Sequence, residues 1–393
     1  MSTINFKNDD GILTIYLAGH IDSNNAGEIE AEITKIADEN KPSNIIIDAA
    51  NLEYISSAGL RIVLRLKKNY PDIKVIELSS EVYEIFEITG FSEMMDIQKA
   101  YRKISVEGCE VIGQGANGKV YRIDQDTIVK EYFNSDALPD IKRERELART
   151  ALILGIPTAI PYDVVKVGNG YGSVFELLNA KSFAKIIISE PEKFDDVVKM
   201  SVELLKKIHS THVKPGLMPR MKDVAVNWVE FLKDYLDADK YDKFIRMVKE
   251  VPETDTMLHG DYHIKNVMLQ DGEVLLIDMD TLCVGHPIFE FASIFNAYQG
   301  YSELDHLNIE KFLGISFEQG KQFWDKTVDL YFDDKTKEEK EEIKKMAMII
   351  GYARNMRRTI RRNGFDTDDG KALIEHCKNR INELLDEVDR LYY

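Results

Sequence analysis

Residues 259–268, HGDYHIKNVM, place two histidines, an aspartate, a lysine and an asparagine within ten positions. Such a stretch is either a polar loop or the working part of an enzyme, and the flanking sequence decides between the two. Asp271 and Gly272 form a hairpin signal, and the apolar segment after them ends in Asp278 and Asp280. The stretch is therefore predicted to lie in a loop directly before a β-hairpin that ends in two carboxylates.

Gly113, Gly115 and Gly118 form the spacing G-x-G-x-x-G, which is a weak signal by itself. In a dinucleotide-binding loop this spacing runs directly into a helix, whereas here KVYRID continues as a strand. The pattern therefore predicts a hairpin whose glycines let backbone N–H groups approach phosphates, as in protein kinases. Lys130 lies in the strand IVKEY, where a phosphate-holding lysine is expected, although a solvated lysine is the common alternative.

A helix is predicted over IKRERELARTALIL, because apolar residues recur on one face and Gly-Ile-Pro follows. Glu144 lies one turn before these apolar positions and could reach inward to Lys130. Glu131 and Glu146 are competitors, and an exposed surface glutamate is the alternative for all three.

The segment YGSVFELL, residues 171–178, is typical of a strand that leads into a hinge between two lobes. Backbone groups from Glu176 to Leu178 would there meet the edge of an adenine ring. The hinge would separate an N-lobe at about 103–178 from a C-lobe at about 179–393.

The spacing His-Gly-Asp, four residues, Asn, then a strand and Ile-Asp resembles the aminoglycoside phosphotransferase and choline kinase superfamily. The resemblance covers about residues 105–390, and HPIFEFA fits it as well. It implies an α+β bilobal, protein-kinase-like domain with a small antiparallel-sheet N-lobe and a mainly helical C-lobe. It also implies an ATP-dependent phosphotransferase that uses Mg²⁺ and has an alcohol group as acceptor.

Within this resemblance, Asp261 matches the catalytic aspartate that orients the acceptor hydroxyl and takes its proton. Asn266 and Asp278 match the metal ligands, whose hard oxygen atoms would hold Mg²⁺ between the β- and γ-phosphates. The chain departs from the family at His286, where most members have aspartate, and at Glu290, where aspartate is often found, and both are interpreted as structural positions.

Other polar residues around this motif leave alternatives open. His259 is interpreted as a bridge that holds the loop. His263 and Lys265 could touch phosphate or acceptor, and solvent is the alternative for both. Asp280 is a candidate for a further metal or substrate contact.

The first hundred residues alternate predicted strands, at 12–21, 44–50 and 73–78, with predicted helices. That order favours a small α/β domain with helices packed on a sheet. The apolar run in NIIIDAA is typical of a strand covered on both faces. The stretch YISSAGLRIVLRL, which follows NIIIDAANL, resembles the STAS domain of anti-sigma-factor antagonists over about residues 1–100.

In the STAS family a partner kinase phosphorylates a serine at the start of a helix, and the matching position here is Ser57. A phosphate at a helix N-terminus meets free N–H groups and the positive end of the dipole. The family more often has Asp-Ser-Ser-Gly, whereas this chain has Ser-Ser-Ala-Gly. The alternative is that Ser56 and Ser57 simply cap the helix.

The organisation predicted from these patterns is a STAS-like domain at 1–102 and a phosphotransferase-like kinase domain at 103–393. The formal net charge of −17 argues against a nucleic-acid partner, because neutralising phosphates needs surplus Lys and Arg. The three cysteines are far apart and indicate neither a disulfide framework nor a zinc site. No signal-peptide pattern and no membrane span are found in the sequence, so a cytoplasmic location is expected.

The phosphate acceptor is the feature that the sequence determines least. Arginines recur at i, i+3, i+4, i+7 and i+8 in GYARNMRRTIRRNG, as Arg354, Arg357, Arg358, Arg361 and Arg362. This arginine stripe favours an anionic acceptor if it borders the cleft, and pairing with acidic helices or with the N-terminal domain is the alternative.

Three functions remain open from the sequence. The first is a small-molecule kinase with a STAS module for regulation or for docking a protein partner. The second is a signalling kinase that phosphorylates a STAS serine, Ser57 in cis or one in a partner. The third is a non-catalytic nucleotide-binding scaffold.

Overall fold

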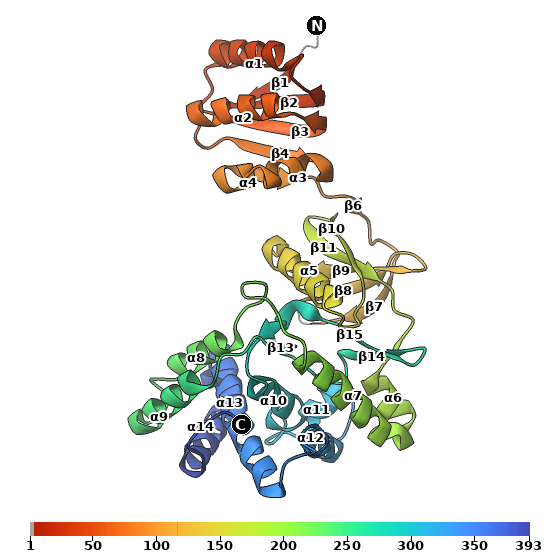
Figure 1. Ribbon diagram of the computed structural model, residues 1–393, viewed down its shortest axis with the longest axis vertical. Coiled ribbons are helices and arrows are strands. Elements are labelled where there is room, and N and C mark those ends of the chain that lie inside the picture. The colour runs from red at the N-terminus through yellow and green to blue at the C-terminus, as the bar shows by residue number, and fades with distance from the viewer. Residues whose placement is uncertain (1–3, 116) are drawn as a thin grey trace. The chain divides into compact units, whose positions relative to one another are not determined.

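The computed structural model describes residues 4–115 and 117–393. Its first unit ends at Ser105 and is built on a five-stranded sheet (Figure 1). Its strands follow the order β1-β2-β3-β4-β5, with β1 antiparallel to β2 and the other neighbours parallel. The elements are β1 (Asn5–Asp9), β2 (Ile12–Ile21), α1 (Ala26–Asn40), β3 (Asn44–Ile55), α2 (Ser57–Asn69), β4 (Lys74–Leu78), α3 (Ser80–Ile88), α4 (Phe91–Met94), β5 (Asp96–Lys99) and β6 (Lys103–Ile104).

The helices of this unit pack on one face of the sheet. Ile33 of α1, Val63 of α2 and Phe86 of α3 share a core with Ile15 and Ile47 of the central strands. Burial alternates along the first half of β3, where every second residue is buried and the residues between are half-buried. The prediction that this strand is covered on both faces is therefore wrong, because period-2 alternation is the sign of one covered face.

The second unit, Val106–Tyr393, begins with an antiparallel sheet in the order β10-β11-β9-β8-β7. Its elements are β7 (Glu110–Gln114), β8 (Gly118–Arg122), β9 (Thr127–Tyr132), α5 (Leu138–Ile153), β10 (Pro161–Val167) and β11 (Gly170–Glu176). Helix α5 packs its buried residues Leu147, Ala148 and Ala151 inward. Gly113, Gly115 and Gly118 lie in the β7–β8 hairpin, as the sequence predicts. Strand β10 was not predicted from the sequence.

The rest of this unit is mainly helical (Figure 1). The helices are α6 (Phe183–Ser189), η1 (Pro191–Lys193), α7 (Phe194–His209), α8 (Met221–Phe231), α9 (Ala238–Glu250), η2 (Met279–Thr281), α10 (Ile288–Phe295), the π-helical turn η3 (Asn296–Gly300), α11 (Leu307–Leu313), α12 (Phe317–Tyr331), α13 (Lys337–Arg361), η4 (Gly364–Asp366) and α14 (Asp368–Glu387). The short strands are β12 (Lys181–Ser182), β13 (Met257–Leu258), β14 (Val267–Gln270), β15 (Glu273–Leu276) and β16 (Cys283–Val284).

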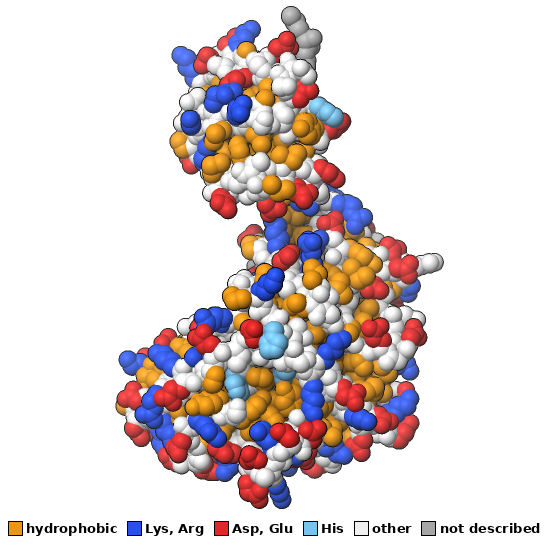
Figure 2. Space-filling view, viewed as in Figure 1, with side chains coloured by type: hydrophobic (Ala, Val, Ile, Leu, Met, Phe, Trp, Pro, Cys, Tyr) orange, Lys and Arg blue, Asp and Glu red, His pale blue; other side chains and the backbone are white. Residues whose placement is uncertain are grey.

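Helix α10 lies at the centre of this helical part, since all eight of its residues are buried. It packs against α13, and aromatic side chains of α10 contact Trp324 and Tyr352. Acidic and basic side chains are interspersed over the visible face of the second unit (Figure 2). Within the described residues, no helix is both long enough and apolar enough to cross a membrane.

Candidate active site

Lys130 of β9 lies between two carboxylates that come from distant parts of the chain. Its Nζ is 2.8 Å from Glu144 Oε1 on α5 and 3.1 Å from Asp278 Oδ1 after β15. Burial alone would lower the pKa of Lys130, but the two carboxylates raise it well above the usual value, so the ammonium stays charged. The structure thus selects Glu144, which is 4% exposed, from the three glutamates that the sequence offered.

Tyr132 holds Glu144 from the other side and is a site residue that the sequence analysis missed. Its hydroxyl donates a hydrogen bond to Glu144 Oε2. Tyr132 lies two residues after Lys130, on the same face of strand β9. The position of a tyrosine at i+2 from the lysine is the signal that could have identified it.

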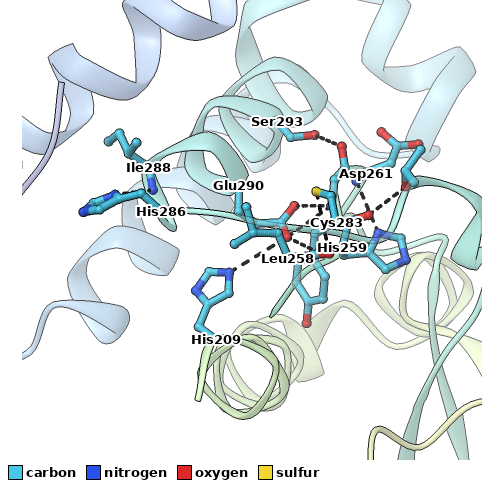
Figure 3. Close-up of polar contacts among 12 residues, drawn as sticks. His209, Leu258, His259, Asp261, Cys283, His286, Ile288, Glu290 and Ser293 are labelled. Atoms are coloured by element: carbon cyan, nitrogen blue, oxygen red, sulfur yellow. Dashed lines mark hydrogen bonds and ion pairs between the residues drawn. The ribbon is translucent and has the colours of Figure 1, made fainter. Parts of the chain in front are cut away.

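The loop 259–266 is anchored to α10 through the buried carboxylate of Glu290 (Figure 3). Glu290 accepts hydrogen bonds from the backbone N–H groups of His259 and Gly260, the second at 3.0 Å. His209 Nε2 approaches the same carboxylate at 3.9 Å from α7. Burial would raise the pKa of Glu290, but the imidazole of His209 and the loop N–H groups lower it. Glutamate is longer than the aspartate often found at this position in the family, and here its carboxylate holds the loop directly.

His286 has a different environment from Glu290. Its Nδ1 accepts a hydrogen bond from the N–H of Ile288 at 3.2 Å, and its ring packs edge-on against Tyr393. Burial lowers the pKa of His286 to about 4, so the ring is neutral near pH 7. Both departures from the family pattern therefore occupy buried positions: Glu290 holds the loop, and His286 packs against Tyr393.

His259 joins the loop to the strand that precedes Asp278. Its Nε2 lies 3.2 Å from the carbonyl oxygen of Ile277, and its Nδ1 accepts the N–H of Asp261 at 3.3 Å. Thr281 donates to the His259 carbonyl at 2.7 Å. These contacts make His259 a bridge within the site, since its fully buried ring has no route to solvent.

Asn266 lies beside Asp278 because of the β14–β15 hairpin. Its carbonyl accepts the N–H of Ile277 at 2.9 Å, and its Nδ2 donates to the Asp261 carbonyl at 3.1 Å. Asp278 has a left-handed backbone with φ 64°, a conformation that costs roughly 1 kcal/mol or more and often marks functional sites.

The oxygen atoms at this place fit Mg²⁺. The amide nitrogen of Asn266 bonds to the loop, which leaves its side-chain oxygen for a metal, and the backbone bond from Ile277 to Asn266 brings Asn266 near Asp278. Within residues 4–115 and 117–393, no three His, Cys, Asp or Glu side chains form a complete metal cage. Mg²⁺ commonly takes only one or two protein ligands and completes its shell with water and phosphate oxygens. A pair of oxygen ligands is therefore sufficient.

Asp261 faces the imidazole of His263 and the guanidinium of Arg354. His263 Nε2 is 3.6 Å from Asp261 Oδ2, and Arg354 Nη2 is 3.9 Å from Oδ1. Burial would raise the pKa of Asp261, but the hydrogen bond and charge of His263, with Arg354 and His259, lower it to about 2. Asp261 is therefore ionised across the physiological range.

His263 is held rigidly, whereas Lys265 is exposed. The ring of His263 is 4% exposed and packs edge-on against Phe312 of α11, with ring centroids 4.9 Å apart. Lys265 Nζ lies over the same Phe312 ring at 5.5 Å. His263 thus contacts the Asp261 carboxylate, while Lys265 points to the surface beside α11.

Asp280 lines a cavity of about 430 Å³ with Tyr132, Glu144 and Arg143. Burial and the nearby Asp278 carboxylate raise the pKa of Asp280 to about 7. The full lining is Asn117, Tyr132, Phe133, Asn134, Ala137, Asp140, Arg143, Glu144 and Asp280.

The three glycines of the β7–β8 hairpin differ in their surroundings. A Cβ on Gly118 would lie 2.1 Å from the carbonyl oxygen of Glu131, so only glycine fits there. The N–H of Gly115 donates to the Gly118 carbonyl at 3.0 Å and closes the turn. Gly113 pairs with Val120 beside a β-bulge. Gly118 is therefore required by strand packing, whereas Gly113 and Gly115 have room for a side chain.

The predicted hinge follows β11. Glu176 is the last residue of this strand, and its Oε2 accepts the N–H of Ile160 at 3.3 Å. The N–H of Leu177 donates to the Asp126 carbonyl at 2.8 Å. Leu178, the next residue, is half-buried.

Ser56 and Ser57 have different environments at the start of α2. Ser56 is the N-cap, and its hydroxyl accepts the N–H of Gly59 at 3.5 Å. Ser57 is the first residue of the helix and is exposed. The capping alternative therefore applies to Ser56.

Arg354 is the stripe residue that reaches the loop. Its Nη1 donates to the Gly260 carbonyl at 3.1 Å and to Ser293 Oγ at 2.8 Å. Ser293 also donates to the Gly260 carbonyl at 2.9 Å. The sequence indicated an arginine face, but only the packing of α13 against α10 placed one of these arginines beside Asp261.

This two-lobed arrangement is that of a kinase-like phosphotransferase. The family model of the phosphotransferase enzyme family matches residues 108–321, more than half of the chain, so the chain belongs to that family. The STAS domain model matches residues 3–104. The predicted fold class, an α/β STAS domain followed by an α+β kinase-like domain, is confirmed.

Individual proteins are similar to each part. BtrV of Bordetella bronchiseptica, a protein named as an anti-sigma factor antagonist, is 37% identical over 92 residues, which cover 22% of this chain and 78% of BtrV. The gentamicin complex of APH(2'')-IIa is 14% identical, covers 79% of this chain and 98% of its own, and has a TM-score of 0.47. A choline/ethanolamine kinase family protein from Mesorhizobium loti is 15% identical and has a TM-score of 0.44. The match covers 70% of this chain and 87% of that protein's chain.

Proposed function

We propose that the second unit is an ATP- and Mg²⁺-dependent phosphotransferase that acts on a hydroxyl of a small molecule, with the STAS unit as a regulatory or docking module. One observation carries this proposal. Lys130 comes from β9, Asp261 and Asn266 from the loop 259–266, and Asp278 from the segment after β15, yet hydrogen bonds and ion pairs connect them. The Asn266 carbonyl accepts a hydrogen bond from the N–H of Ile277, the residue before Asp278, and this link supports a shared role for Asn266 and Asp278.

Each residue has a proposed role in nucleotide binding. The Lys130 ammonium, fixed by Glu144, holds the phosphates, and the β7–β8 hairpin with Gly113, Gly115 and Gly118 covers them. Backbone groups from Glu176 to Leu178 bind the adenine edge. Asn266 and Asp278 would hold Mg²⁺, which when bound neutralises charge on the β- and γ-phosphates.

Asp261 orients the acceptor. The hydroxyl oxygen bonds to the γ-phosphorus while the bond to the β–γ bridging oxygen breaks, ADP leaves, and the hydroxyl proton passes to Asp261. A carboxylate whose pKa is about 2 is a weak base, so its main contribution is to position the hydroxyl.

A second candidate function has a specific observation in its favour. Ser57 is exposed at the N-terminus of α2, and Ser56 rather than Ser57 supplies the cap. A phosphate on Ser57 would therefore displace no capping bond. The acceptor hydroxyl in this candidate is Ser57, in the same chain or in another copy.

Incubation of the full chain with γ-labelled ATP and Mg²⁺ separates these functions. Label on the protein that disappears in Ser57→Ala supports the second candidate. ATP turnover that requires an added metabolite, and persists in Ser57→Ala, supports the first. Asp261→Asn should reduce turnover at least about 100-fold, because positioning contributes strongly to such reactions.

The matched control is Asp255→Asn, which makes the same chemical change at a surface aspartate paired with His212 at 2.7 Å. This variant should retain full turnover. If wild type binds ATP but shows no turnover, the chain is a non-catalytic scaffold and both enzyme proposals are wrong. If turnover occurs and Asp261→Asn leaves it unchanged, the role proposed for Asp261 is wrong.

A further inference from the structure

Most of the arginine stripe lacks carboxylate partners. Among the described residues, no carboxylate oxygen lies within 4.0 Å of a nitrogen of Arg357, Arg358, Arg361 or Arg362. Only Arg354 has such a neighbour, and it is Asp261 at 3.9 Å. Pairing with acidic helices is therefore not the arrangement in the structure.

Two of these arginines lie over aromatic rings of α8. The guanidinium of Arg354 is 5.5 Å from the centre of the Trp228 ring, and that of Arg357 is 5.6 Å from the Phe231 ring. A stacked guanidinium uses its face for the aromatic contact and keeps N–H groups at its edge. Those edges are suited to a planar or tetrahedral anion.

The aromatic support is itself fixed. Phe231, Tyr235 and Phe365 form a continuous stack, with ring centroids 5.9 and 5.8 Å apart. Glu230, the acidic residue next to Phe231 in α8, pairs with Lys249 of α9 at 3.6 Å. The positive charge beside Phe231 is therefore left without a carboxylate of its own.

Arg357 also has an unsatisfied donor. Its Nε is buried and has no hydrogen-bond partner. Burial and the neighbouring Arg361 lower the pKa of Arg357, as expected where positive charge is crowded and partly removed from water. The unpaired Nε shows that no acceptor among the described residues offsets the charge on this side of the guanidinium.

We propose that Arg354 and Arg357, stacked on Trp228 and Phe231, form a subsite for an anionic group of the phosphate acceptor. This inference rests on the proposed transfer at Asp261, because Arg354 connects the subsite to that carboxylate. The acceptor class is a hydroxyl compound that carries a phosphate or carboxylate group. Arg354 also holds Gly260 through its Nη1, so Arg357 is the residue whose main role is binding the anion.

Titration of the full chain with inorganic phosphate tests the subsite without requiring turnover. The chain has two tryptophans, and Trp324 is only 2% exposed, so a change in emission would report on Trp228. We expect a saturable change in wild type and an affinity at least about tenfold weaker in Arg357→Gln. Arg357→Lys, which keeps the charge but loses the planar edge, should be intermediate.

Two controls make the result specific. Arg362→Gln makes the same charge change at an exposed residue just beyond α13 and should bind phosphate as wild type does. Lys130→Met removes the proposed nucleotide lysine and should also leave the response unchanged. No saturable response in wild type, or equal weakening in Arg362→Gln, would overturn the subsite.

Turnover gives an independent comparison with paired acceptors. A polyol phosphate should have a lower KM than its parent polyol, and Arg357→Gln should raise the first KM at least about tenfold with little change in kcat. A phosphate response without any turnover would leave the subsite standing and reject the phosphotransferase. Turnover without the phosphate response would reject the subsite alone.

Discussion

Replacing Glu290 with alanine should destabilise the second unit and disorder the loop at Asp261. Glu290 is fully buried and accepts the N–H groups of His259 and Gly260. Alanine leaves both backbone donors without their carboxylate partner. Each unsatisfied buried donor costs about 1–3 kcal/mol, so we expect a loss of about 4 kcal/mol in the free energy of unfolding. Glu290→Gln keeps an acceptor oxygen and should cost about 1–2 kcal/mol.

Urea unfolding followed by tryptophan emission measures this loss, because Trp228 and Trp324 both belong to the second unit. Hydrogen exchange of the His259 and Gly260 amides gives the local result and should be faster in Glu290→Ala. The surface variant Glu230→Ala breaks only an exposed pair with Lys249 and should change stability by less than about 0.5 kcal/mol. If Glu290→Ala unfolds like Glu230→Ala and its amides stay protected, the anchoring role of Glu290 is refuted.

Three further predictions concern other parts of the chain. His263→Asn should raise the pKa of Asp261 from about 2, so the acid limb of the profile of kcat/KM against pH should shift to higher pH. The ionised Asp261 also stabilises the fold above its unfolded pKa of about 3.9, and this stabilisation is lost as pH falls toward 2. Gly118→Ala should destabilise the β-sheet by more than about 2 kcal/mol in urea unfolding, because its Cβ meets a backbone oxygen, whereas Gly115→Ala has open space and should be tolerated. Ser56→Ala should lower the thermal stability of the first unit by about 1 kcal/mol through loss of the α2 cap, and no loss in calorimetry would contradict that capping role.

Local patterns in the sequence predicted much of this architecture. The hairpins around Gly115 and at Asp271–Gly272 form as expected, because turn residues and strand periodicity act over a few neighbouring positions. The same applies to strand β2, whose bounds of Ile12–Ile21 match the predicted strand. The apolar run in β3 was misleading, because a run of isoleucines has the same sequence whether one face or both faces of a sheet are covered.

The sequence by itself determined which chemical groups this protein has. They are a glycine-rich hairpin, a strand that carries a lysine, and a loop with an aspartate and an asparagine that is followed by a second aspartate. Tertiary structure decided which groups meet. Glu144 reaches Lys130 because α5 turns that residue inward, and Arg354 reaches the loop because α13 packs against α10. Helical periodicity defines a face but not its neighbour, so contacts between residues more than ninety positions apart depend on the packing of the whole unit.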